Sequence, residues 1–113
     1  MTVTTHEALF ATMPPETRAR LEAIQAEVER RVPGAQRCIA YKMPAFRKGR
    51  IFFYFAGFKT HIGIFPPVSD PALVAELAPY HGPKGNLRFL LKDPLPLDLI
   101  GRVAATLALE YAK

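Results

Sequence analysis

Cysteine, serine and aspartate are scarce in this chain, and their scarcity excludes much familiar chemistry. The 113 residues include one cysteine, one serine and three aspartates, two of which stand directly before prolines. A lone cysteine, Cys38, allows no disulfide within the chain and fits a reducing compartment, so we expect a cytoplasmic protein. A Cys38–His61 pair would lack a third group to orient the histidine. With no assembled nucleophile and base, and no paired carboxylates, we expect no enzyme.

Long apolar runs are missing as well. No stretch reaches the roughly 20 residues that a membrane span needs, so we expect no membrane partner. The N-terminus lacks the basic and apolar regions of a secretory signal. A chain of this length fits one domain over residues 1–113, and half of its residues are hydrophobic, which is enough to build a single core.

Acidic residues are absent from the middle of the chain. Residues 30–69 contain eight Lys or Arg and no Asp or Glu, whereas the remainder has seven basic and ten acidic residues. The formal charge is therefore +8 inside this segment and −3 outside it. Eight of the twelve aromatic residues lie within residues 37–67. A sheet built here would present rings and cations together, which suits an anionic or planar ligand.

The spacing of apolar and capping residues predicts four helices. Residues 5–11 form a short one, and a second begins at Pro14-Pro15 and runs to about residue 31, with its apolar side chains at helical spacing. Asp70-Pro71 is a good helix start, and that helix reaches about residue 77. The last helix spans about residues 97–111, with an apolar stripe of Ile100, Ala104, Leu107 and Tyr111.

Between the helices, the pattern predicts short strands with tight turns. The expected strands are residues 36–42, 45–47, 50–56, 60–66 and 86–91. We expect Met43-Pro44 to break the first from the second, Lys48-Gly49 to form a turn, and Gly57-Phe58 to close a hairpin. Clustered strands favour an α+β domain, in which an antiparallel sheet of about five strands packs with N-terminal, middle and C-terminal helices.

The register of that hairpin determines which side chains meet. If Ala56 pairs with Lys59, the alternating apolar residues of the two strands share one face and form the core. The opposite face then carries Phe52 and Tyr54, with Tyr54 directly beside His61 on the neighbouring strand. We expect these rings to lie away from the core, and Gly63 to leave room beside them.

This face and its neighbouring loops supply the candidate ligand-binding residues. They are Tyr41, Met43, Phe46, Phe52, Tyr54, Lys59, His61, Lys84 and Arg88. Each also has a structural explanation: the aromatic and methionine residues near the expected strand break could be packing, and the loop cations could be solvated. His61 could titrate, ligate a metal or contact an anion, or it could be half-buried and bonded to Tyr54 or the backbone.

Four segments in order resemble a known family. They are AYKMPAF at residues 40–46, KTHIGIFP at 59–66, KGNLRF at 84–89 and LPLDLI at 95–100. Together they resemble the YdhG-like domain family, a bacterial family largely without assigned function, in which Gly usually stands at the place of Lys42. The resemblance implies a small cytoplasmic α+β domain. One branch of that family is described as a frataxin-like iron chaperone, so the resemblance also implies iron handling.

From the residues we expect a non-catalytic binding protein that takes a small ligand or an anion at the aromatic and basic sheet face. Single-stranded nucleic-acid binding at the same face is the alternative, ranked lower because a net charge of +5 is ordinary for small domains. A homodimer through an unprotected edge strand also stays open. The residues themselves name neither the ligand nor a metal.

Overall fold

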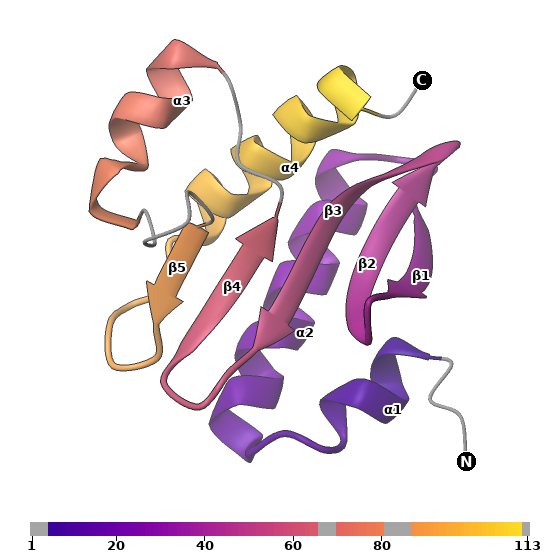
Figure 1. Cartoon of the computed structure of the whole chain (residues 1–113), viewed down its shortest axis with the longest axis vertical. Helices are drawn as coiled ribbons and strands as arrows, with labels where there is room; N and C mark the ends of the chain where they lie inside the picture. The colour runs from indigo at the N-terminus through magenta and orange to yellow at the C-terminus, as the bar shows by residue number, and fades with distance from the viewer. Residues whose placement is uncertain (1–4, 66–69, 81–86, 112–113) are drawn as a thin grey trace.

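The computed structural model describes residues 5–65, 70–80 and 87–111, which form one sheet with helices packed against it (Figure 1). The elements in chain order are α1 (His6–Phe10), α2 (Pro15–Arg31), β1 (Gln36–Ala40), β2 (Met43–Lys48), β3 (Arg50–Gly57), β4 (His61–Phe65), α3 (Pro71–Glu76), the 3-10 turn η1 (Ala78–Tyr80), β5 (Leu87–Leu90) and α4 (Leu97–Tyr111). No helix among these residues is long and apolar enough to cross a membrane.

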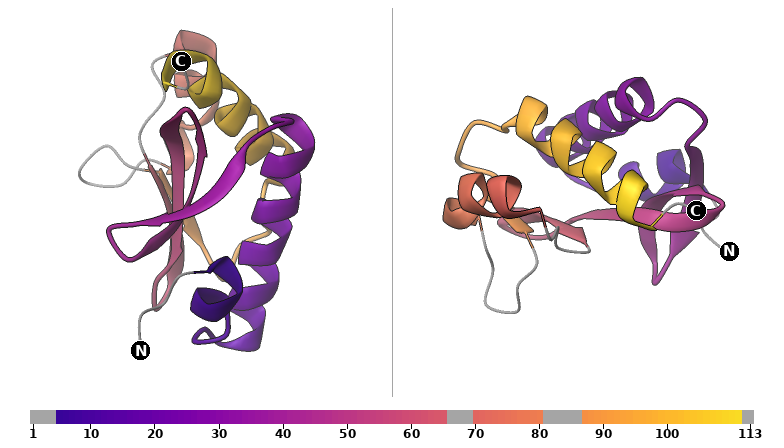
Figure 2. Two further views of the ribbon diagram at one scale, coloured as in Figure 1. Left: turned by 90° about the vertical axis from the view of Figure 1, so that its right-hand side faces the viewer. Right: turned by 90° about the horizontal axis from the view of Figure 1, so that it is seen from above.

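The sheet has five antiparallel strands in the order β1-β2-β3-β4-β5, so every strand pairs with its neighbours in sequence. Figure 2 shows α2 and α4 lying over one face of the sheet, and Figure 1 shows α1 beside the start of β2. In the described part of the chain no helix covers the opposite face, which we call the open face. The expected α+β class and five-stranded antiparallel sheet are confirmed.

Local signals in the sequence explain where the helices begin. The Thr5 hydroxyl accepts a hydrogen bond from the Ala8 amide and caps α1. Pro15 occupies the first turn of α2, where its missing N–H costs nothing. The Asp70 carboxylate accepts from the Leu73 amide and caps α3, as the Asp70-Pro71 pair predicted.

The core lies between the helix pair and the sheet. Leu21, Ile24 and Val28 form the buried stripe of α2, as their spacing predicts. The strands contribute the apolar face expected of the hairpin, which consists of Phe53, Phe55, Ile62 and Ile64, all fully buried. The expected stripe of α4 is correct except at its end, because Tyr111 is 41% exposed and Val103 is buried instead.

A chain of ion pairs crosses the outside of the helical layer. Arg31 of α2 donates to the carboxylate of Glu27 at 2.7 Å and also contacts Asp98 of α4. Arg102 of α4 contacts Asp98 and donates to Glu76 of α3 at 2.8 Å. Hydrogen bonds from Arg31 and Arg102 lower the pKa values of Asp98 and Glu76, and the pKa of Glu27 is lowered most by Arg30 and next by Arg31. The side chains of Glu27 and Arg31 are mostly buried, whereas those of Asp98, Arg102 and Glu76 are exposed, so the outer pairs orient the helices more than they stabilise the fold.

Gly101 lets this ion-pair chain lie directly on the backbone of α4. A Cβ atom at this position would lie 2.6 Å from Oε2 of Glu27 and 2.8 Å from Nε of Arg31. Real Cβ atoms do not approach other groups so closely, so with any larger residue the ends of the Glu27 and Arg31 side chains must move aside. Glycine therefore allows α2 and α4 to pack closely, although a glycine destabilises the interior of a helix.

In an uncrowded helix interior, replacing glycine by alanine raises the free energy of unfolding by about 1 kcal/mol. We expect Gly101→Ala to give less than this gain, because the ends of the Glu27 and Arg31 side chains must move aside and their ion pair is disturbed. Urea unfolding measures the difference. The control is the same substitution in a Glu27→Ala background, where the crowding carboxylate is gone and the gain should be larger. An equal effect in both backgrounds would contradict this explanation.

Candidate ligand-binding cavity and open sheet face

The turn between β1 and β2 falls at Tyr41-Lys42, one step before the expected break at Met43-Pro44. Ala40 pairs with Met43, and both turn residues have positive φ angles, 51° for Tyr41 and 61° for Lys42. Two positive φ angles match the twist of a tight hairpin, but Gly or Asn normally fills such positions. Side chains with a Cβ atom are strained there, and strain of this kind often marks a functional segment.

The predicted break was wrong because Pro44 is tolerated inside β2. The pairing of β2 with β3 begins only at Ala45, which faces Tyr54. The backbone N–H that Pro44 lacks would therefore not be part of the hydrogen bonds between β2 and β3. Met43 consequently stands on the open face together with Ala45, since alternate residues of a strand share a face.

The hairpin of β3 and β4 is also longer than predicted. Tyr54 pairs with Phe65 and Gly57 with Ile62, so β3 continues through Gly57 and the tip is Lys59-Thr60. The amide of Phe58 donates to the carbonyl of His61 at 2.8 Å and closes this turn. The expectation that Tyr54 and His61 are direct cross-strand neighbours was therefore wrong.

The predicted faces of the two strands are still correct, because the observed register differs from the predicted one by an even number of residues. Gly57 explains why the strand continues. A Cβ atom there would lie 2.7 Å from Cγ2 of Thr17, so only glycine allows the first turns of α2 to pack against this end of β3. The polar residues Lys59 and Thr60 then form an exposed tip.

Two predicted site residues belong to the core instead. Phe46 pairs with Phe53 and Arg47 with Ile51, which leaves Phe52 as the extra residue of a β-bulge. The bulge breaks the alternation of faces, so Phe52 joins Phe53 in the buried cluster rather than standing beside Tyr54. Phe46 and Phe52 are both 0% exposed, so neither can contact a ligand on the open face.

The open face carries a continuous row of rings, which we call the aromatic row. The Tyr41 and Tyr54 ring centroids are 5.9 Å apart, and Tyr54 pairs with Phe65 on β4. A Cβ atom at Gly63 would lie 2.9 Å from Phe58 and 3.3 Å from Phe65, so both rings rest on this glycine. Phe58 in turn stacks on the imidazole ring of His61, with ring centroids 4.9 Å apart. The row thus consists of Tyr41, Tyr54, Phe65, Phe58 and His61.

His61 lies at one end of this row in an environment that favours the neutral ring. It pairs with Leu90 of β5, its buried Nδ1 atom has no hydrogen-bond partner, and among the described residues no hydrogen bond joins the ring to Tyr54 or to the backbone. Burial lowers the pKa of His61, and the nearby charge of Arg88 lowers it further. Arg88 is exposed and faces Gly63 across β4 and β5.

We expect NMR titration to place the pKa of His61 below its ordinary value of about 6.5. Because the folded protein binds this proton less readily than the unfolded chain, His61 lowers stability as the pH falls from about 6.5 toward that depressed pKa. Arg88→Gln should raise the pKa partway, since burial is the larger cause. A value at or above 6.5 in the unsubstituted protein would contradict the burial that the structure shows.

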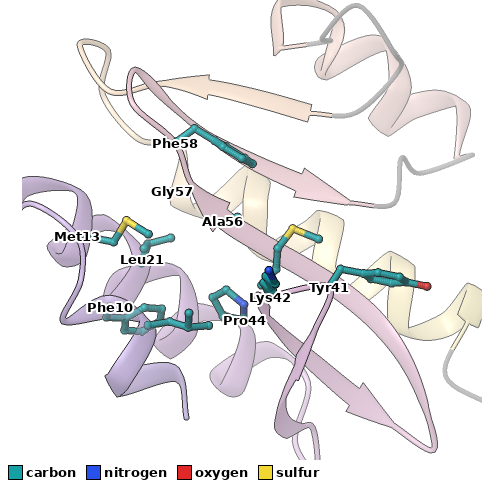
Figure 3. Close-up of a pocket in the computed structure, with 11 residues that line it drawn as sticks. Phe10, Met13, Leu21, Tyr41, Lys42, Pro44, Ala56, Gly57 and Phe58 are labelled. Atoms are coloured by element: carbon teal, nitrogen blue, oxygen red, sulfur yellow. The ribbon is translucent and has the colours of Figure 1, made fainter. Parts of the chain in front are cut away.

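A mostly apolar cavity lies where the strained turn meets α1 and the start of α2. Its volume is about 300 Å³, which suits a small molecule. Figure 3 shows Phe10, Met13 and Leu21 on one side, Phe58 at another, and Lys42 next to Pro44, whereas the phenol of Tyr41 points away. The remaining lining residues are Leu9, Met43, Ala56 and Gly57. We call this space the rim cavity.

Lys42 gives the rim cavity its charge. The residue is exposed and makes no ion pair within the described part of the chain. Within residues 5–65, 70–80 and 87–111 it is also the only charged residue that lines this cavity. An occupant therefore meets apolar side chains over most of its surface and a single ammonium group at one side.

His6 is a structural residue that the sequence analysis left without a role. It is 1% exposed, and its Nε2 lies 3.0 Å from the carbonyl oxygens of Cys38 and Ala45. The Gln25 amide lies 3.0 Å from Nδ1, so a neutral ring that donates from Nε2 and accepts at Nδ1 is fully bonded. His6 thereby fastens α1 to β1 and β2 beside the rim cavity. Nothing in its local sequence signals these distant partners.

The other predicted residues divide between this region and elsewhere. Lys59 is exposed at the hairpin tip, and Lys84 lies outside the described residues. Cys38 and His61 stand on β1 and β4, with two strands between them, so the pair considered for catalysis is not assembled. Burial raises the pKa of the Cys38 thiol, which further disfavours a reactive thiolate.

Carboxylates near the helices are occupied by arginine. Arg37 of β1 donates to Glu7 of α1 and to Glu29 of α2, and Glu27 and Glu76 belong to the ion-pair chain described above. Among the described residues no group of three or more His, Cys, Asp or Glu could hold a metal ion. Iron handling therefore remains only what the resemblance implies.

Comparison with solved structures relates this fold to a known protein. The chain is similar to a crystal structure of YdhG, a protein from the DUF1801 family, from Bacillus subtilis. The TM-score is 0.77 at 18% identity, over 94% of this chain and 90% of that chain. The chain has the YdhG fold. At this identity the likeness shows the fold alone, which agrees with the resemblance of the four sequence segments. No protein-family model matches the sequence, and no curated protein matches it.

Proposed function

We propose that this protein is a non-catalytic binding module whose rim cavity takes a small anion with an apolar body. The observation that carries the proposal is the composition of the cavity: an apolar wall from α1, α2 and β3, lined also by Lys42, which makes no ion pair among the described residues. Apolar pockets with a few placed polar groups are the usual form of small-molecule sites. We also place the protein in the cytoplasm, because its lone cysteine fits a reducing compartment.

The strained turn supports this proposal. Tyr41 and Lys42 keep positive φ angles although glycine would adopt them without strain. Glycine at Lys42 would remove the single cation of the cavity, so the chain retains a side chain where the backbone disfavours one. A ligand that needs the ammonium group gives a physical reason for this cost.

The direct test compares two ligands that differ in charge alone. We expect 3-phenylpropionate to shift amide signals of the cavity residues in a protein NMR titration, and to bind roughly tenfold tighter than 3-phenylpropanol, as one charge-assisted hydrogen bond allows. Lys42→Gln should abolish that preference, whereas Lys92→Gln, an exposed lysine that does not line the cavity, should preserve it. Equal binding of acid and alcohol, or shifts confined to other surfaces, would refute the proposal.

A second test separates backbone strain from ligand binding. We expect Lys42→Gly to raise the free energy of unfolding by about 1 kcal/mol, because glycine accepts the positive φ angle, and to weaken 3-phenylpropionate binding. Lys42→Ala is the matched control: it loses the amine as well but keeps the Cβ atom and its strain. Urea unfolding and the same titration measure both effects. Equal stability of the Gly and Ala variants would show that the turn stores no strain.

A further inference from the structure

We propose that the open face binds single-stranded nucleic acid, with bases stacked on the aromatic row and phosphates held by the cations around it. This site shares Tyr41 and Phe58 with the rim cavity and extends beyond it across the sheet. Tyr54, Phe65 and Arg88 belong to the open face and do not line the rim cavity. Variants at these three residues therefore test the aromatic row without altering the cavity lining.

The first support is the form of the row. Tyr41 is 83% exposed and Phe58 44% exposed, and the three rings between and beside them are half-buried. The rings come from adjacent strands and turns, so they lie one after another across the sheet rather than in one compact cluster. A sheet with such rings can stack two or three unpaired bases, as known single-strand binders do.

The second support is charge. None of the five strands contains Asp or Glu, so the sheet offers no carboxylate that would repel phosphate. Exposed cations surround the row at Lys42, Arg47, Lys59 and Arg88. The acids in the described part of the chain lie on the helices and in other segments outside the strands. The open face is thus complementary to a polyanion, and its charge favours a nucleic acid over a neutral partner.

The geometry favours single strands over duplexes. In a duplex the faces of the bases are stacked on one another, so exposed rings gain nothing from it. A duplex reader inserts a helix or a ribbon into a groove, and in the part of the chain described here no helix stands on the open face. A simple anion such as polyphosphate would use the cations and leave the rings without a role.

Fluorescence anisotropy with a short labelled oligothymidylate tests the proposal. We expect binding that weakens steeply between roughly 50 and 200 mM salt and exceeds binding to a duplex of the same length. Tyr54→Leu and Phe58→Leu should each reduce affinity at least about fivefold, because leucine keeps the apolar volume but removes the stacking surface. Tyr111→Leu, at an exposed ring on α4, is the matched control and should change nothing.

Arg88→Gln supplies an independent readout at an exposed position that the fold tolerates. It should lower the slope of log affinity against log salt by about 0.7, the loss of one phosphate contact on a single strand. Absence of salt-sensitive binding would overturn the proposal. So would oligothymidylate binding that the two row variants leave intact, or that inorganic polyphosphate matches in strength, because the face would then bind anions without stacking bases.

Discussion

The close approach of α2 to Gly57 fixes much of what surrounds it. Because Thr17 packs where a Cβ atom would otherwise stand, only glycine fits at this point of β3. The strand runs through Gly57 to a tip at Lys59-Thr60, and Phe58 lies over Gly63 on the open face. This helix–strand contact thus lies beside one wall of the rim cavity and one end of the aromatic row.

The molecule divides into two chemically different layers. The helices carry acids, and those of α1, α2, α3 and α4 named above are matched to arginines in ion pairs. The sheet carries cations and rings without acids. Such a division leaves the helices to hold one another in place and leaves the sheet free to meet an anion. The aromatic row lies on this second layer, the rim cavity lies between it and the start of the helical layer, and the two sites share the strained Tyr41-Lys42 turn.

Several features of the fold could be predicted because their causes are local. Capping by Thr5 and Asp70, proline at the first turn of α2, and the spacing of Leu21, Ile24 and Val28 act within a few residues. The alternation of Phe53 and Phe55 identified the core face of β3. The charge division and the clustering of aromatic residues were likewise visible in the sequence, and they pointed correctly to a sheet rich in rings and cations.

The sequence by itself therefore determined the helices and strands to within a few residues, the fold class, and the buried face of the β3–β4 hairpin except at Phe52, since these follow from periodicity and from short-range hydrogen bonds. Only the tertiary structure decided the positions along the strands. β3 and β4 pair further along than their local pattern indicates, the bulge at Phe52 turns that ring into the core, and the distant carbonyls of Cys38 and Ala45 hold His6 in place. These features depend on partners far away in the chain, and no local pattern of residues specifies which distant atoms will meet.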